Sequence, residues 1–109
     1  MFKDLNLVKR YKHNPILSKK DIPYKADLIF NAGVTKYHNV YYMIFRNDYK
    51  GTPGDSVGLA GTNLGLAKSK DGIHWTVDKK VRFTLKDKEI KRIYDPRLQI
   101  IDDEIYMTF

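Results

Sequence analysis

Short runs of β-favouring residues, separated by polar turns, dominate this sequence. Runs rich in Val, Ile, Tyr and Phe are typical of strands that are at least half buried. Four such runs are predicted to be strands: residues 28–34, 40–46, 64–69 and 73–77. Polar turns at residues 36–39 and 70–72 join neighbouring runs, which predicts antiparallel hairpins. No segment shows the apolar spacing of an amphipathic helix, so the sequence predicts an all-β fold.

The order of the runs suggests how the strands are grouped. Residues 47–61 are loop material, and residues 81–85 form either a further strand or an extended connector. Residues 98–101 and 104–109 flank an acidic turn and predict a final hairpin. A barrel, a sandwich and a propeller all fit so many short strands. The first four strands nevertheless amount to one four-stranded blade, and a second blade would begin near Tyr94.

Composition narrows the classes of function. The net charge is +7, from 20 Lys and Arg against 13 Asp and Glu, but the basic residues are scattered and match no nucleic-acid-binding motif. We therefore interpret them as a solvated surface and predict no nucleic-acid partner. The chain has no cysteine, which excludes disulfides and thiolate metal sites. No segment approaches the ~20 apolar residues that span a bilayer, so we expect no membrane partner and a cytoplasmic location.

The motif Tyr-Asp-Pro-Arg at residues 94–97 carries the main candidate for chemistry. Pro96 cannot donate a ladder hydrogen bond, so it belongs at the first residue of a strand or at an edge. Asp95 then lies where a loop passes into a strand and can present its carboxyl group to a cleft. If the strand already runs there, Arg97 shares a face with Asp95 and would favour the ionised carboxylate unless burial shifts its pKa the other way. Two interpretations stay open: a structural Asp–Arg pair or capped turn, and a catalytic acid.

Five motifs occur in an order and spacing that resemble a known family. They are Asn-Pro-Ile-Leu at 14–17, Phe-Asn-Ala-Gly-Val at 30–34, Tyr-Tyr-Met-Ile-Phe-Arg at 41–46, Leu-Gly-Leu-Ala-Lys-Ser-Lys-Asp-Gly-Ile-His-Trp at 64–75, and the motif at 94–97. Together they resemble glycoside hydrolase family 130, the mannoside phosphorylases and related β-mannosidases. Ser-x-Asp-Gly-x-x-Trp alone also occurs in other sugar-active propellers, whereas the ordered set is fairly specific.

The resemblance implies a five-bladed β-propeller with a sugar site at the mouth of its channel. Asp95 matches the family's catalytic acid, which protonates the glycosidic oxygen through the sugar's 3-hydroxyl while inorganic phosphate attacks with inversion. Asn31 and Arg46 match residues that hydrogen-bond the mannosyl unit, and Tyr94 would lie beside the neighbouring sugar. The implied partner is a β-mannoside oligosaccharide. No metal or cofactor is implied, and phosphate acts as a co-substrate.

Chain length shapes the predicted domain organisation. Residues 1–26 are predicted to be an N-terminal extended segment, and residues 27–109 the first one to two blades of a truncated propeller. At ~40–50 residues per blade, five blades need roughly 200–250 residues. We therefore expect this chain to be the N-terminal portion of an enzyme and to be inactive alone. Because the edges of its blades would be exposed, we also expect it to form a homo-oligomer through them. The family's glycine-serine stretch appears here as residues 61–63, and a basic residue expected near it is absent.

Other functions remain as alternatives. The full enzyme is either a phosphorylase, releasing mannose 1-phosphate, or a β-mannoside hydrolase. A non-catalytic carbohydrate-binding or oligomerising module would use Arg46 and the aromatic residues as a lectin-like patch, with Asp95 structural. A polyanion binder is a third alternative. Judged from the residues alone, Asn31 would hydrogen-bond a backbone group at a strand kink, and Arg46 would be a surface residue at the end of a strand. His74 and Trp75 are expected to pack in their hairpin.

Overall fold

The structure is a computed structural model that describes residues 8–49, 61–90 and 92–109. These residues form one 3₁₀ turn, η1 (Lys19–Asp21), and six strands. The strands are β1 (Leu28–Tyr37), β2 (Val40–Tyr49), β3 (Gly61–Ser69), β4 (Thr76–Val77), β5 (Arg97–Ile101) and β6 (Glu104–Thr108). The described parts of the chain contain no α-helix. The predicted all-β fold is confirmed.

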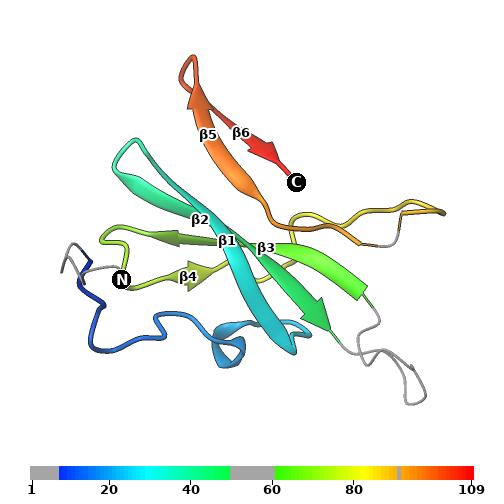
Figure 1. Ribbon diagram of the computed structural model, residues 1–109, viewed down its shortest axis with the longest axis horizontal. Coiled ribbons are helices and arrows are strands. Elements are labelled where there is room, and N and C mark those ends of the chain that lie inside the picture. Colours follow the sequence, from blue (N-terminus) through cyan, green and yellow to red (C-terminus); the bar gives the residue numbers. More distant parts are fainter. Residues whose placement is uncertain (1–7, 50–60, 91) are drawn as a thin grey trace, which may run out of the picture.

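Strands β1 to β4 form a single antiparallel sheet in chain order, β1-β2-β3-β4 (Figure 1). This is the order predicted for one blade. The turn between β1 and β2 consists of His38 and Asn39, which both have positive φ (46° and 62°), as a type I′ hairpin turn requires. Strand β2 runs to Tyr49 and β3 begins at Gly61, so the predicted loop over 47–61 is too long at both ends. Residues 50–60 of that loop lie outside the described residues.

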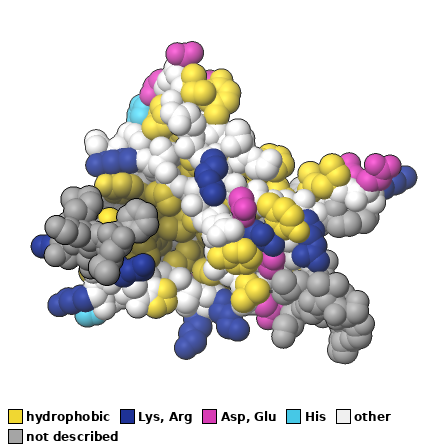
Figure 2. Space-filling model, viewed as in Figure 1, with side chains coloured by type: hydrophobic (Ala, Val, Ile, Leu, Met, Phe, Trp, Pro, Cys, Tyr) yellow, Lys and Arg dark blue, Asp and Glu magenta, His cyan; other side chains and the backbone are white. Residues whose placement is uncertain are grey.

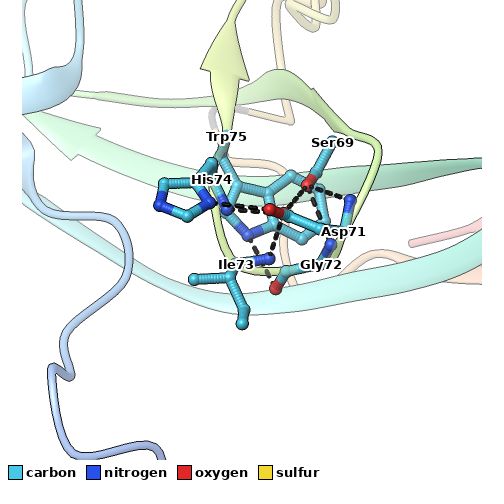
Figure 3. A network of polar contacts seen from close by, with 6 residues as sticks. All are labelled: Ser69, Asp71, Gly72, Ile73, His74 and Trp75. Atoms are coloured by element: carbon cyan, nitrogen blue, oxygen red, sulfur yellow. Dashed lines mark hydrogen bonds and ion pairs between the residues drawn. The ribbon is translucent and has the colours of Figure 1, made fainter.

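The predicted strand over residues 73–77 is mostly wrong, because only β4 (Thr76–Val77) pairs with β3. The preceding residues instead form a turn around the side chain of Asp71 (Figure 3). Asp71 Oδ1 accepts hydrogen bonds from the backbone N–H groups of Ile73 and His74, at 2.8 Å each. An aspartate that binds nearby backbone donors in this way competes with the sheet for them. The local side chain therefore decides where β4 can begin.

The two side chains that end this turn differ in their surroundings. Trp75 donates from Nε1 to the Gly72 carbonyl (3.2 Å) and packs against an apolar cluster on the sheet, as expected. His74 was expected to pack as well, but its ring is exposed, and Nδ1 lies 2.7 Å from Asp71 Oδ2. That hydrogen bond and those from the backbone hold the pKa of Asp71 below its usual range. His74 thus supports the turn and contributes little to the packing.

The segment at residues 81–85 is an extended connector. Phe83 and Leu64 exchange one pair of backbone hydrogen bonds, with Leu64 donating at 2.9 Å and Phe83 at 3.4 Å. This isolated bridge places Phe83 beside β3 without forming a strand. The chain then leads to the second sheet, in which β5 pairs with β6. Its turn, Asp102 and Asp103, again has two positive φ values (48° and 61°).

Each face of the four-stranded sheet carries its own apolar cluster. Alternate residues of a strand point to opposite faces, and β2 contributes Met43 and Phe45 to one cluster and Ile44 to the other. The first cluster also contains residues of the N-terminal segment, Leu17, Ile22, Tyr24 and Ala26. The second contains Leu64, Ile93, Leu66, Leu98 and Met107. The segment before Asp95 and the β5–β6 hairpin therefore pack on the second face.

The tips of the two hairpins are also in contact. Tyr37 donates from its hydroxyl to the Asp103 carbonyl (2.7 Å), and His38 Nε2 lies 3.0 Å from Asp103 Oδ1. These contacts join the β1–β2 turn to the β5–β6 turn across 65 or more positions of sequence. The second hairpin is thus fixed at its tip as well as at its base. The predicted domain division at residue 26 stays a prediction.

On the face drawn in Figure 2, Lys and Arg side chains are distributed around the molecule and do not gather in one stripe. Within the described ranges, no helix is long and apolar enough to cross a membrane. The same residues contain no group of three or more His, Asp and Glu side chains arranged to hold a metal ion.

Candidate active site

An irregularity in β1 places Asn31 next to the Asp95 motif. The pairing of β1 with β2 shifts register between Phe30 and Gly33, which marks a β-bulge. Asn31 lies in this bulge with a φ of 47°, a left-handed conformation that asparagine tolerates better than most residues. Its Nδ2 donates to Asp95 Oδ1 at 2.9 Å. The bulge therefore turns the Asn31 side chain toward the carboxylate and not toward a backbone group.

Asp95 lies on a tight segment immediately before β5, as predicted. Its φ is also 47°, and its side chain is 47% exposed. Pro96, the next residue, is buried against β1. A Cβ at Gly33 would lie 2.6 Å from the Pro96 carbonyl oxygen, so only glycine allows this close approach. The segment is thus held against the sheet while its carboxyl group stays accessible.

Arg46 connects the sheet to the Asp95 segment. Its guanidinium packs against two aromatic rings, with Cζ 4.5 Å from the centroid of Phe30 and 4.0 Å from that of Tyr94. Such stacking is typical of arginine and favourable when the cation is shielded from water. Arg46 Nη1 lies 3.8 Å from Asp95 Oδ1. The side chain is only 15% exposed, so it is not the surface residue that its place on the strand suggests.

Asp48 forms two hydrogen bonds with the same guanidinium. Arg46 donates from Nε to Oδ1 at 2.8 Å and from Nη2 to Oδ2 at 2.7 Å, while the Asp48 side chain is 1% exposed. The hydrogen bond to Asp48 is the main cause that raises the pKa of Arg46 above its usual value, although burial opposes it. Arg46 is therefore a permanent cation at this site.

The structure brings together all four residues predicted for the site: Asn31, Arg46, Tyr94 and Asp95. One expectation about their neighbourhood is wrong. Arg97 donates from Nη1 to the backbone carbonyls of Pro96 (2.9 Å) and Asp95 (3.4 Å), and the guanidinium near the carboxylate belongs to Arg46. The positive φ of Asp95 is the physical reason, because it interrupts the strand alternation on which the shared face depended.

Sequence reasoning missed two residues of the site, Phe30 and Asp48. Both follow from strand geometry: Asp48 is two residues from Arg46 on one strand, and Phe30 is the cross-strand partner of Arg46. An Arg-x-Asp pair at the end of an apolar strand was the available signal. Residues 61–63, where the family pattern differs, are buried in β3 opposite residues 47–49.

A cavity of about 510 Å³ opens beside Asn31. Its walls include Asn31 and Phe30 of β1 and the motif at residues 14–17, together with Arg10, Ile29, Ala32, Met43 and Phe45. Asp95 is not part of its wall but contacts Asn31, which is. A hollow of this size is within the range that holds small ligands. The site thus offers a carboxyl group, amide and guanidinium donors, and an aromatic ring.

Comparison with known proteins identifies the family. The profile of glycoside hydrolase family 130, described as beta-1,4-mannooligosaccharide phosphorylase, matches residues 3–109. The chain belongs to glycoside hydrolase family 130. It is also 30% identical over 104 residues to a 1,2-beta-oligomannan phosphorylase of Thermoanaerobacter sp. (strain X514), covering 94% of this chain and 35% of that protein. The chain therefore spans about a third of the length of this relative.

Membership of family 130 confirms the resemblance found in the sequence. It makes this chain part of a family of glycoside phosphorylases and hydrolases. The two antiparallel sheets are part of the five-bladed β-propeller of this family, and their assignment to a first and a second blade stays a prediction.

Proposed function

We propose that this family 130 chain carries the mannosyl-binding and acid-bearing part of an enzyme that phosphorolyses β-mannosides with inversion and releases mannose 1-phosphate. The observation that carries this proposal is the hydrogen bond from Asn31 Nδ2 to Asp95 Oδ1, at 2.9 Å. It joins residues 64 positions apart that the family pattern assigns to one site. The relative from Thermoanaerobacter, a 1,2-beta-oligomannan phosphorylase, supports the same class of reaction.

In this proposal Asp95 is the acid. Asn31 donates to Oδ1, and Arg46 Nη1 lies nearest to the same oxygen. Both contacts are made by Oδ1, so Oδ2 is the oxygen proposed to deliver the proton. The exposed carboxyl group delivers this proton to the glycosidic oxygen through the sugar's 3-hydroxyl, and the bond to the leaving sugar breaks.

Arg46, Asn31 and Tyr94 position the substrate. The guanidinium and the amide offer planar donors that suit sugar hydroxyls and the charge developing at the ring. One face of the Tyr94 ring covers Arg46, and the side chain is 44% exposed. The exposed part of Tyr94 is proposed to pack against the neighbouring sugar.

Inorganic phosphate is the proposed nucleophile and co-substrate. An inverting displacement needs a nucleophile on the face opposite the acid. With phosphate in that role a single carboxyl group is sufficient. The groups that hold phosphate are proposed to lie in other parts of the enzyme, so that the 109 residues alone are inactive. A cytoplasmic location is part of the same proposal, because phosphorolysis depends on a supply of phosphate.

The test follows the products formed by the complete enzyme from 1,2-β-mannobiose and from 1,4-β-mannobiose, with and without phosphate. Phosphorus and proton NMR together identify the released sugar and its anomer. The expected product is α-mannose 1-phosphate, formed only when phosphate is present. Free mannose formed equally well without phosphate would establish the hydrolase alternative and overturn the proposal.

A further inference from the structure

We propose that Asp48 is a positioning residue, which acts on the sugar site only through Arg46. The expected effects on turnover rest on the proposed function, which assigns Arg46 to binding of the mannosyl unit. The arrangement of Asp48 around Arg46 is independent of that assignment.

The hydrogen bonds of Asp48 determine which edge of Arg46 is free. The carboxylate occupies Nε and Nη2, at 2.8 Å and 2.7 Å. The remaining nitrogen, Nη1, is the one that faces Asp95 Oδ1 at 3.8 Å. A two-point contact between planar groups fixes rotation within the plane of the guanidinium. Asp48 therefore directs one particular N–H edge toward the site.

Two rings fix the guanidinium in the remaining direction. Phe30 and Tyr94 both pack against it, with ring centroids 4.5 Å and 4.0 Å from Cζ. The plane of Arg46 is thus held by the stack, and its orientation in that plane is held by Asp48. Tyr94 is adjacent to Asp95 in the chain, so the same contacts also locate the segment that carries the acid.

Burial of Asp48 argues for positioning as its main contribution. A carboxylate that is 1% exposed loses nearly all of its hydration. Buried ion pairs add little net stability, and apolar residues of similar size often replace them without loss. An apolar residue in place of Asp48 could not hold the guanidinium of Arg46 in one orientation, whereas a carboxylate can. The pair is therefore better explained by the geometry of Arg46 than by stability.

The experiment is a double-mutant cycle in the complete enzyme, with Asp48→Asn, Arg46→Ala and the two combined. Because a misplacement of about 1 Å in a positioning group can reduce turnover about 100-fold, Asp48→Asn is expected to lower kcat/KM by that order. The same substitution in the Arg46→Ala background is expected to change kcat/KM less than about twofold, because the two residues act as one unit. An equal loss in both backgrounds would overturn the proposal.

A matched control and a second variant complete the cycle. Thr62 is the buried cross-strand partner of Asp48, and its hydroxyl has no hydrogen-bond partner among the described residues, so Thr62→Val is expected to leave kcat/KM unchanged. Folding of each variant is checked by circular dichroism and by its thermal unfolding. If Asp48→Asn does not fold, Asp48→Glu replaces it in the cycle. Asp48→Glu keeps the charge but displaces the guanidinium, so the same loss and the same dependence on Arg46 are expected.

A spectroscopic readout separates this proposal from the proposed function. In ¹⁵N NMR, the wild-type Arg46 side chain should show a protected Nε–H signal and slow rotation about Cζ–Nε. Both features should be lost in Asp48→Asn and kept in Thr62→Val. An unchanged Arg46 signal in Asp48→Asn would overturn the positioning role, even if turnover falls. Absence of phosphorolysis in the wild type would count against the proposed function and leave this readout intact.

Discussion

Asn31 and Asp95 share a backbone conformation that is uncommon for residues other than glycine. Each has a φ of 47°, and a hydrogen bond between their side chains joins them. Residues in sparsely populated conformations persist where the surroundings hold them, and they often lie at functional sites. Here a bulge in β1 and the close packing of Pro96 on Gly33 supply that support. Each of the two residues is an asparagine or aspartate, the types that adopt this conformation most readily.

Gly33→Ala tests the contact that holds the Asp95 segment. The new methyl group would lie 2.6 Å from the Pro96 carbonyl oxygen, so the segment has to move away from β1. We expect a loss of about 1–3 kcal/mol in the free energy of unfolding, as for other overpacked sites. Urea denaturation measures it. Val34→Ala, at an exposed neighbouring position, is the control, with a change within about 0.5 kcal/mol. Equal stability of Gly33→Ala and wild type would contradict the packing described here.

At the scale of single residues, the sequence predicted which four residues make up the candidate site, but not all of the contacts that surround them. The family pattern located Asn31, Arg46, Tyr94 and Asp95, and the structure brings these side chains together. Spacing within the motif suggested Arg97 as the charged neighbour, but the positive φ of Asp95 redirects the chain. Asp48 was missed because a carboxylate two positions from an arginine is usually solvated. The burial of Arg46 and Asp48 depends on the packing of Tyr94 over the strand, which the sequence does not reveal.

At the scale of elements, the sequence located the hairpins well and the ends of strands poorly. Runs of β-favouring residues with polar turns specify β1–β2 and β5–β6, because pleated pairing and turn chemistry are local properties. The start of β4 was mistaken because residues 73–75 favour a strand while Asp71 binds their backbone donors. A sequence shows which side chains can cap a turn. It does not show whether their hydrogen bonds to the backbone will replace those of strand pairing.

The turn around Asp71 carries a prediction about pH. The hydrogen bond from His74 and those from the backbone hold the pKa of Asp71 below the value of about 3.9 expected in the unfolded chain. The folded state therefore binds fewer protons, so Asp71 stabilises the fold fully above about pH 4 and progressively less at lower pH. Asp71→Asn should lower the Tm at neutral pH, by an amount that decreases as the pH falls below about 4.

Thermal unfolding between pH 2.5 and 7 measures this difference. Lys70→Gln, at the exposed adjacent position, is the control, because lysine does not titrate in this range and its effect should not vary with pH. A difference between wild type and Asp71→Asn that grows on acidification would show that the sign is wrong.

At the scale of the whole molecule, the two sheets meet through an apolar cluster, through the packing of β1 against the start of β5, and through contacts between the hairpin tips. The radius of gyration is 16.0 Å, whereas a compact domain of this length has about 13 Å. The arrangement of the two sheets is therefore more open than that of a compact domain. Hydrophobic side chains stay exposed on the second hairpin and at its end, among them Ile101, Tyr106 and Phe109.

Leu64→Ala tests the cluster between the sheets. Leu64 is 0% exposed and packs with Ile44 and Ile93, so its truncation leaves a cavity between the sheet and the segment that leads to Asp95. We expect a loss of about 2–5 kcal/mol in the free energy of unfolding, measured by urea denaturation. Leu28→Ala, at an exposed position of β1, should change it by less than about 0.5 kcal/mol. Similar losses for both variants would mean that the sheets do not meet through Leu64.

The central claim is that the Asp95 carboxyl group delivers the proton that releases the sugar. The most direct measurement compares Asp95→Asn with wild type in the complete enzyme, using calorimetry for mannobiose affinity and product assays for turnover. Because Asn keeps the shape and the acceptor oxygen but cannot donate an acidic proton, affinity should stay within about threefold while turnover falls by about 10³-fold or more. Turnover equal to that of wild type, at unchanged affinity, would contradict the claim.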